Sequence, residues 1–407
     1  MRLCYESTGL LGYGAPAKSI ATTLDMCENM FGREGASVLT PLFRLQIPND
    51  TSRKIIHVDM DAFYASIEMR DDPSLRTRAL VIAHDPRQTG GKGVITTANY
   101  VARQYGVNSA MPAIEAVRKV PRRLLVFKDP DFEKYHAVSD QIHDIFHQVT
   151  DLIEPIALDE AYLDVTNNTH FPTTIALALW LQQTIERQTR LTCAIGVSYN
   201  RFLAKMASEF NKPGGRTVVT PGMAQEFLAP QPIGKFRGVG KKTLPRLQAL
   251  GIETGADLLA ADPGMLQREF GKAGFMLALH ARGIDNHPIE VKERKSIGKE
   301  RTYNPPLQSS AAVRQELTML AGKVSAELRK KQRHGTTVVL KVRDVDFNTQ
   351  TRRMTRERYF VDADDILDAA WTLYNEETDT SASLRLVGIT ITGLVPLTFE
   401  NVDLPLR

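Results

Sequence analysis

The sequence of 407 residues contains little cysteine and no long apolar run. Its three cysteines, Cys4, Cys27 and Cys193, are widely spaced and odd in number, which argues against a disulfide framework and a zinc site. No apolar stretch approaches the roughly 20 residues of a membrane-spanning helix, and the N-terminus lacks the charged and then apolar layout of a signal peptide. These absences predict a cytoplasmic protein in a reducing compartment, with no membrane partner.

The composition is ordinary, but the charge is unevenly distributed. Hydrophobic residues make up 43% and charged residues 24%, as is typical of globular proteins, and the length favours more than one domain. The formal net charge is only +4 at pH 7, yet residues 291–360 hold 17 lysines and arginines against 7 acids. This basic block predicts a polyanionic partner. A solvated, solubilising surface is the open alternative.

Hydrophobic periodicity predicts a folded region after a polar start. Residues 1–52 are rich in Gly, Ser, Thr and Ala and predict an extension, with a helix at 21–31. We then expect strands at 54–58, 80–83, 94–97 and 191–197, a hairpin at 153–165, and helices at 62–69 and 201–210. Lys212-Pro213-Gly214-Gly215 ends the last helix. The alternation of strands and helices predicts an α/β domain with one sheet.

The remainder of the chain is first helical and then mixed. Residues 221–285 predict a glycine-containing helical segment, and the charged residues 292–299, which lack periodicity, predict a linker. Beyond it we expect helices at 312–333 and 363–374, strands at 337–342, 351–359 and 384–394, and a flexible tail at 398–407. The second half thus predicts a separate unit of strands and helices.

Four carboxylates stand beside predicted strands. Asp59 and Asp61 flank Met60 at the end of one strand, and Asp159 and Glu160 lie near the turn of the hairpin. Converging carboxylates repel one another, and a hard divalent cation such as Mg²⁺ relieves that cost. Two such ions suit phosphoryl transfer. Strand-end carboxylates without any special role are the alternative that these pairs alone leave open.

Four blocks in the same order carry a resemblance to a known family. They span residues 54–68, 97–103, 158–165 and 195–205, and they closely resemble blocks of the Y-family DNA polymerases, with the bacterial DinB-type branch nearest. The resemblance runs from about Arg53 to the C-terminus. It implies template-directed addition of deoxynucleotides to a primer 3′ end, low-fidelity translesion synthesis, no proofreading and two Mg²⁺ ions. The implied partners are primer–template DNA and deoxynucleoside triphosphates.

The resemblance also implies a right-hand polymerase of mixed α/β (α+β) class. After the extension at 1–52, the palm would span 53–218, with small fingers inserted at about 62–128. A helical thumb at 219–286 and a linker at 287–296 would lead to a little finger at 297–396. A tail at 397–407 would follow. A monomer in the bacterial cytoplasm, associated with the nucleoid, is the expected form.

Metal-binding roles follow by matching positions of the resemblance. Asp59 and Asp159 match the carboxylates that bridge both metals, and Glu160 matches the ligand of the catalytic metal. The backbone carbonyl of Met60 would complete the nucleotide-side metal site. Asp61 is outside the ligand set of the family, and we predict that it caps the N-terminus of the helix at 62–69 instead.

The nucleotide contacts implied by the resemblance lie between and after these acids. Tyr64, preceded by Phe63, matches the steric gate, a ring that clashes with a ribose 2′-hydroxyl; an ordinary helix-face core position is the alternative. The matching triphosphate contacts are Thr97, Tyr100, Arg103 and Lys205. Because Tyr100 and Arg103 are three residues apart, they would share a helix face.

DNA-holding and partner-binding segments are predicted in the second half of the chain. Residues 236–243 predict the turn of a helix–hairpin–helix, with candidate contacts at Gly238, Gly240, Lys241 and Lys242. In the basic block, alternating arginines predict phosphate contacts, namely Arg352, Arg353 and Arg356. The tail resembles a peptide that docks on a sliding clamp, through Asn401, Leu404 and Leu406. A plain helix connection and a frayed terminus are the respective alternatives.

Two other functions are compatible with the acids alone. A two-metal nuclease or a nucleotidyl cyclase uses a similar constellation, and the helix–hairpin–helix, the basic block and Tyr64 favour a polymerase over a cyclase. A non-catalytic DNA- or clamp-binding relative would not need all three carboxylates, Asp59, Asp159 and Glu160. The sequence therefore favours a polymerase.

Overall fold

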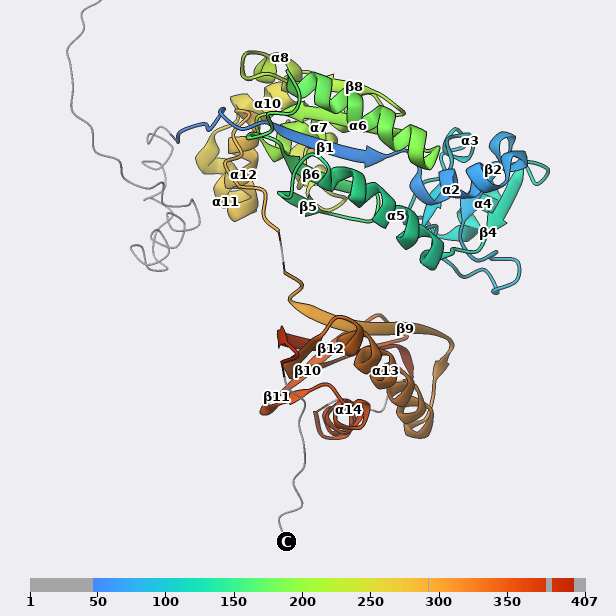
Figure 1. The fold of residues 1–407 in the computed structure, drawn as a ribbon. Helices are drawn as coiled ribbons and strands as arrows, with labels where there is room; N and C mark the ends of the chain where they lie inside the picture. Colours follow the sequence, from blue (N-terminus) through green and yellow to red (C-terminus); the bar gives the residue numbers. More distant parts are fainter. Residues whose placement is uncertain (1–46, 292, 378–382, 399–407) are drawn as a thin grey trace, which may run out of the picture. The chain divides into compact units, whose positions relative to one another are not determined.

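The computed structural model describes residues 47–291, 293–377 and 383–398, which fall into two compact units divided between Val291 and Lys292 (Figure 1). The helix predicted at 21–31 and the candidate clamp-binding residues lie outside the described residues. Within the described ranges, no helix has the length and apolar character needed to cross a bilayer.

A five-stranded sheet forms the centre of the first unit, in the order β5-β6-β1-β7-β8. The strands are β1 (Ile55–Met60), β5 (Ile153–Pro155), β6 (Glu160–Asp164), β7 (Cys193–Ser198) and β8 (Arg216–Val218). β1 lies in the middle and pairs antiparallel with both β6 and β7. The predicted hairpin is present as β5 and β6, which also pair antiparallel.

The two faces of this sheet are covered by different helices. Alternate side chains of β1, such as Ile56 and Val58, share a buried core with side chains of α5 (Phe132–His147) and α6 (Thr174–Thr189). The intervening side chains point to the other face, where α7 (Arg201–Phe210) packs. At Gly196, a Cβ atom would lie 1.9 Å from the carbonyl oxygen of Ala204, so this glycine allows α7 to approach β7 closely.

A separate three-stranded sheet, in the order β3-β2-β4, holds the strand predicted at 80–83, so the prediction of a single sheet is wrong. The strand predicted at 94–97 is also wrong in its bounds, because only Thr97 of that range lies in a strand. The strands of this sheet are β2 (Ala79–Ile82), β3 (Thr97–Ala98) and β4 (Leu125–Lys128). The helical elements around it are α2 (Phe63–Asp71), η1 (Pro73–Thr77), α3 (Tyr100–Arg103) and α4 (Ala113–Lys119). Because it has its own buried cluster, including Val81 and Ala98, this sheet forms a subdomain.

Short helices make up the rest of the first unit. They are η2 (Pro221–Met223), α8 (Ala224–Leu228), η3 (Ile233–Lys235), α9 (Leu244–Ala249), α10 (Gly255–Ala260), α11 (Pro263–Phe270) and α12 (Lys272–Ala281). Their buried side chains join Phe202 and Leu203 of α7 in one cluster. This segment therefore packs on the same helix that covers the central sheet.

The second unit is a four-stranded antiparallel sheet, in the order β11-β10-β12-β9, with α13 and α14 packed against it (Figure 1). The elements are β9 (Ser296–Leu307), α13 (Ser310–Lys330), β10 (Arg333–Asp344), β11 (Thr349–Phe360), α14 (Ala363–Glu377) and β12 (Leu384–Pro396). The prediction of a linker at 292–299 is wrong at its end, because β9 begins at Ser296.

Candidate active site

Strand pairing brings the predicted acids together. Asp59 near the end of β1 lies directly opposite Glu160, the first residue of β6, in the antiparallel register. Paired residues project to the same face of a sheet, here the face that α7 covers. Asp159 immediately precedes β6, and its carbonyl oxygen accepts a hydrogen bond from the Met60 amide at 2.9 Å. The three carboxylates therefore lie at the same end of the β1–β6 strand pair.

Two lysines lie against these carboxylates. The ammonium group of Lys205, on α7, is 2.6 Å from Oε2 of Glu160 and 3.2 Å from Oε1 of Glu209. The ammonium group of Lys212 contacts Oδ1 of Asp59 and donates to the Met60 carbonyl oxygen at 3.2 Å. Lys212 was interpreted from sequence only as part of a helix stop. Nothing in the sequence around Lys212, apart from its position just after α7, indicates its contact with Asp59.

The carboxylates differ in their electrostatic environment. Burial, together with the charges of Asp59 and Glu160, raises the pKa of Asp159 to about 6. Burial also raises the pKa of Glu160, but hydrogen bonds from His57 and Lys205 outweigh it and bring the pKa down to about 2. Asp159 and Glu160 thus have pKa values shifted in opposite directions, although they are neighbours in the chain.

A buried histidine supports Glu160 from within the sheet. The His57 ring is 0% exposed, and burial lowers its pKa. Its Nδ1 is 2.8 Å from the Ser208 hydroxyl, and its Nε2 is 3.5 Å from Oε2 of Glu160. The Tyr162 ring packs against it with centroids 4.6 Å apart. These contacts fix the ring beside the carboxylate.

Asp61 does not cap α2, so that prediction is wrong. The helix begins at Phe63, and its N-cap is Ala62, whose φ of 43° is left-handed and which gives no side-chain cap. The Asp61 carboxylate instead accepts hydrogen bonds from the Thr192 hydroxyl at 2.7 Å and the Gly214 amide at 2.9 Å. It thereby ties the start of β7 and the turn after α7 to the end of β1.

Tyr64 rests on a supported aromatic platform. Its ring stacks on Tyr135, with centroids 4.5 Å apart and an interplanar angle of 16°. The Tyr135 hydroxyl donates to buried Glu68 at 2.9 Å, and Glu68 forms ion pairs with Lys128 at 2.6 Å and Lys134 at 2.8 Å. Because Glu68 is held on several sides, the ring beneath Tyr64 has a fixed position.

Tyr64 also lies close to the acids. Burial and the charge of Asp159 raise the pKa of the Tyr64 hydroxyl. Phe63, its neighbour, is buried in the core shared with α5 and α6. Phe63 is thus a core residue, whereas Tyr64 packs against that core and has its hydroxyl within the influence of Asp159.

The predicted triphosphate contacts form a second group. Thr97 lies in β3, and Tyr100 and Arg103 lie in α3, where the Arg103 guanidinium is 5.3 Å from the centroid of the Tyr100 ring. The Tyr100 hydroxyl donates to Asp61 at 3.3 Å. Lys205, on α7, donates to Glu160 instead. Of the predicted triphosphate contacts, it is therefore the one that lies against the acids.

The predicted hairpin is an exposed turn between η3 and α9. Gly238 has a φ of +92°, a left-handed conformation that glycine adopts without strain. Lys241 and Lys242 are exposed, whereas Gly240 has an ordinary φ. Arg237, which sequence analysis did not single out, donates to the Tyr162 hydroxyl at 2.8 Å. The turn is thus joined to the strand that bears Glu160.

The predicted arginines of β11 lie on two faces. Arg353 pairs with Val339 and is exposed on the face away from the helices. Arg352 and Arg356 point to the other face, because alternate residues of a strand do so. Arg356 forms an ion pair with Asp365 of α14 at 2.6 Å. Of the three, Arg353 is the one on the open face.

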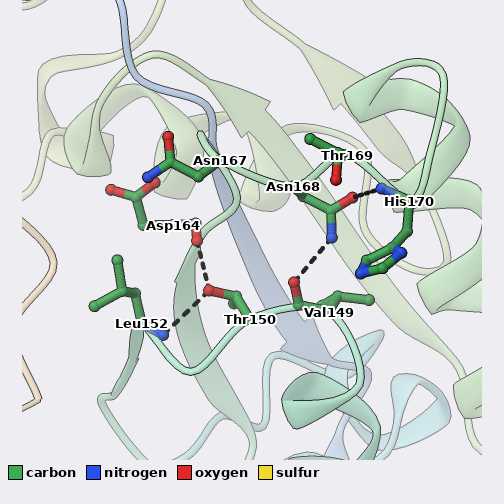
Figure 2. A pocket seen from close by; sticks show the side chains of 8 residues that line it. All are labelled: Val149, Thr150, Leu152, Asp164, Asn167, Asn168, Thr169 and His170. Carbon is green, nitrogen blue, oxygen red and sulfur yellow. Dashed lines mark hydrogen bonds between the residues drawn. The ribbon is translucent and has the colours of Figure 1, made fainter.

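One hollow lies away from the acids, at the opposite end of β6 (Figure 2). It is bordered by Asp164 and by the loops on either side, including Asn168 and Thr150. The Asn168 amide donates to the Val149 carbonyl at 2.9 Å, and the Thr150 hydroxyl donates to the Asp164 carbonyl at 2.8 Å. Its polar groups satisfy one another and hold the two loops together.

The donor set at the acids fits a hard cation. In the described ranges, no group of three or more His, Cys, Asp or Glu side chains is arranged to hold a metal ion, and lysine ammonium groups contact Asp59 and Glu160 instead. The available donors are nevertheless carboxylate and carbonyl oxygens, which suit Mg²⁺ or a similar ion. Burial and the neighbouring charges of Asp59 and Glu160 raise the pKa of Asp159, and a bound cation would offset the cost of its ionised form.

Comparisons with known proteins agree with this geometry. Residues 58–209 match the impB/mucB/samB family, residues 221–252 match its helix–hairpin–helix motif, and residues 294–404 match its C-terminal domain. A Y-family DNA polymerase chimera has a similar fold, with a TM-score of 0.74 and 27% identity, over 84% of this chain and 99% of that chain. The three matched segments of the impB/mucB/samB family together cover parts of both units of the chain.

Curated relatives are similar over nearly their whole length. DNA polymerase IV of Streptococcus thermophilus (strain ATCC BAA-491 / LMD-9) is 47% identical over 358 residues, which is 88% of this chain and 97% of the relative. DNA polymerase IV of Streptococcus pneumoniae serotype 2 is 47% identical over 85% of this chain and 98% of the relative. The chain therefore belongs to the Y-family DNA polymerases. It is a DNA-directed DNA polymerase of translesion synthesis that binds primer–template DNA and nucleotides and depends on a divalent metal.

Proposed function

We propose that Asp59, Asp159 and Glu160 carry the nucleotidyl transfer. The observation that supports this most strongly is the register of β1 and β6, which sets Asp59 directly opposite Glu160. The Met60 amide, bonded to the Asp159 carbonyl, joins the third carboxylate to the same place. Carboxylates of different ionisation beside a nucleotide site are typical of catalytic centres.

Mg²⁺ is the proposed cofactor, as two ions. Asp59 and Asp159 would be shared by both ions, Glu160 would hold the catalytic ion and the Met60 carbonyl would hold the nucleotide-side ion. Such ions activate an attacking oxygen and stabilise a leaving oxygen in phosphoryl transfer. Oxygen-only donors favour Mg²⁺ over zinc.

The two lysines would act as mobile counter-charges. Each of them contacts one of the three acids, Lys205 at Glu160 and Lys212 at Asp59. If cations were held by the acids, both ammonium groups would be free to contact the phosphates of the nucleotide. Lys212 is proposed as a triphosphate ligand beside Lys205, because it contacts the Met60 carbonyl, which would hold the nucleotide-side ion.

Nucleotide selection is assigned to the surroundings of Tyr64. Its half-buried ring, held by Tyr135, would lie beneath the sugar and exclude a 2′-hydroxyl. Tyr100 and Arg103 would contact the triphosphate, with Thr97 beside them on β3. Guanidinium groups form paired hydrogen bonds with phosphate oxygens, which suits Arg103 for this role.

The domain assignments follow from these roles. The five-stranded sheet would be the palm, the three-stranded sheet the fingers, the short helices the thumb and the second unit the little finger. The turn with Lys241 and Lys242 and the exposed Arg353 would hold DNA through its phosphates. We further propose that the protein is monomeric, that it acts at the nucleoid in the cytoplasm, and that its C-terminal tail binds a sliding clamp.

A primer-extension assay tests the assignment of the acids. Asp159→Ala should reduce extension by at least about a hundredfold, because a metal-bridging oxygen is lost. Asp144→Ala is the matched control, since Asp144 is exposed on α5 away from the acids. Equal extension by the wild type and Asp159→Ala, with DNA binding intact, would refute the assignment.

A further inference from the structure

An arginine-lined cavity adjoins the proposed nucleotide site. It has a volume of about 300 Å³ and is bordered by α2, the start of α3 and the connection between α6 and β7. Arg70, Arg76 and Arg190 line it from separate segments, and none of the residues that line it is acidic. Three guanidinium groups without an acid among the lining residues favour a polyanionic ligand.

The guanidinium groups retain binding capacity. The Arg70 guanidinium forms an ion pair with Asp71 at 2.9 Å and donates to the Thr189 carbonyl at 3.1 Å. Among the described residues, the Arg76 guanidinium makes one hydrogen bond, from Nε to the Met69 carbonyl at 3.3 Å. In the described part of the chain, Arg190 makes no side-chain hydrogen bond and no ion pair, and both Arg76 and Arg190 are exposed. A guanidinium has five N–H donors, so several remain for a ligand.

Polar contacts connect the cavity to the acidic site. Three of its lining residues, Ser66, Tyr100 and Thr192, donate hydrogen bonds to Asp61. Asp61 follows Asp59 by two residues, so these hydrogen bonds connect the cavity lining to the strand end that carries the acids. Tyr100, a proposed triphosphate contact, is thus also one of the residues that line this cavity.

We propose that this cavity is a binding subsite for pyrophosphate, the product that each nucleotide addition releases. The inference rests on the proposed placement of the triphosphate beside Tyr100. Pyrophosphate has several charged oxygens that forked guanidinium groups contact in pairs, and the cavity adjoins the place where it forms. Capture there draws the product away from the acids and disfavours the reverse reaction.

Direct binding of inorganic pyrophosphate tests the proposal. Isothermal titration calorimetry on the full chain measures the affinity for pyrophosphate. EDTA in the buffer removes divalent cations and so excludes metal-dependent binding at the acids. Arg76→Gln combined with Arg190→Gln should weaken pyrophosphate binding by at least about tenfold, since two charge-assisted contacts are lost. Arg118→Gln, at an exposed arginine of α4, is the matched control and should bind as the wild type does. Replacing both arginines with lysine should restore part of the affinity.

Three outcomes would overturn the proposal. The first is unchanged pyrophosphate binding in the double variant, and the second is an equal loss in Arg118→Gln, which would indicate net charge alone. The third is an equal loss of affinity for primer–template DNA, which would assign the arginines to the DNA backbone. Asp159→Ala should still bind pyrophosphate in EDTA while failing to extend primers. A failure of the subsite is therefore distinguishable from a failure of the acid assignment.

Discussion

Replacing Asp159 with Asn should stabilise the metal-free protein while abolishing its activity. The pKa of Asp159 is raised from its ordinary 3.8 to about 6, so the ionised carboxylate costs the folded state about 3 kcal/mol at most. Partial exposure of the side chain reduces this through solvent screening, and we expect a gain of about 1–2 kcal/mol at pH 8. Asn keeps the shape, and the backbone carbonyl that pairs with Met60 is unchanged.

The stability that Asp159→Asn gains over the wild type should increase as the pH rises. Between pH 4 and about 6, the folded state binds more protons at Asp159 than the unfolded state does, so wild-type stability falls as the pH rises through this window. The advantage of Asp159→Asn is thus largest above pH 6 and disappears toward pH 4.

Urea unfolding in EDTA measures this difference. In a Trp371→Phe background, Trp180 of α6 reports on the first unit alone. Mg²⁺ should then stabilise the wild type more than Asp159→Asn. Equal stability of the two proteins at pH 8, or a less stable variant, would refute the account of repelling acids.

Three further predictions concern the nucleotide and the DNA. Tyr64→Ala should raise ribonucleotide incorporation relative to deoxynucleotide incorporation by about tenfold or more, and unchanged sugar selection would exclude a steric gate. Lys212→Ala should raise the KM for the nucleotide by about tenfold, because a charged phosphate contact is lost; steady-state extension with an unchanged KM contradicts this role. Arg353→Gln should reduce the salt slope of DNA affinity by about one. Arg356→Gln, whose guanidinium pairs with Asp365, should have a smaller effect, and equal effects would refute the assignment of faces.

Much of the fold was predictable because hydrophobic periodicity is local. The helix predicted at 201–210 is present with those bounds as α7, and the predicted hairpin is present as β5 and β6. The strand β9 (Ser296–Leu307) was not predicted, and its first residues were assigned to a linker. It lies at the edge of its sheet, is largely exposed and contains Pro305 and Pro306, so it lacks the alternation of a half-buried strand.

The site was predictable in its parts but not in its contacts. The resemblance located Asp59 and Glu160, and strand register explains why residues a hundred positions apart meet. The Lys212 contact and the bonds of Asp61 to Thr192 and Gly214 join segments more than 130 positions apart. Local spacing carries no information on such pairs, and for Asp61 it favoured a helix cap that the backbone at Ala62 does not form.

Counting divalent ions in the assembled complex tests the central claim most directly. Mn²⁺ replaces Mg²⁺ as a paramagnetic reporter, and the primer ends in a dideoxynucleotide so that chemistry stops with the incoming nucleotide bound. Electron paramagnetic resonance should show two Mn²⁺ ions for each wild-type complex and fewer than two for Asp59→Ala. Two ions bound with equal affinity in Asp59→Ala would contradict the assignment of the acids as the metal site.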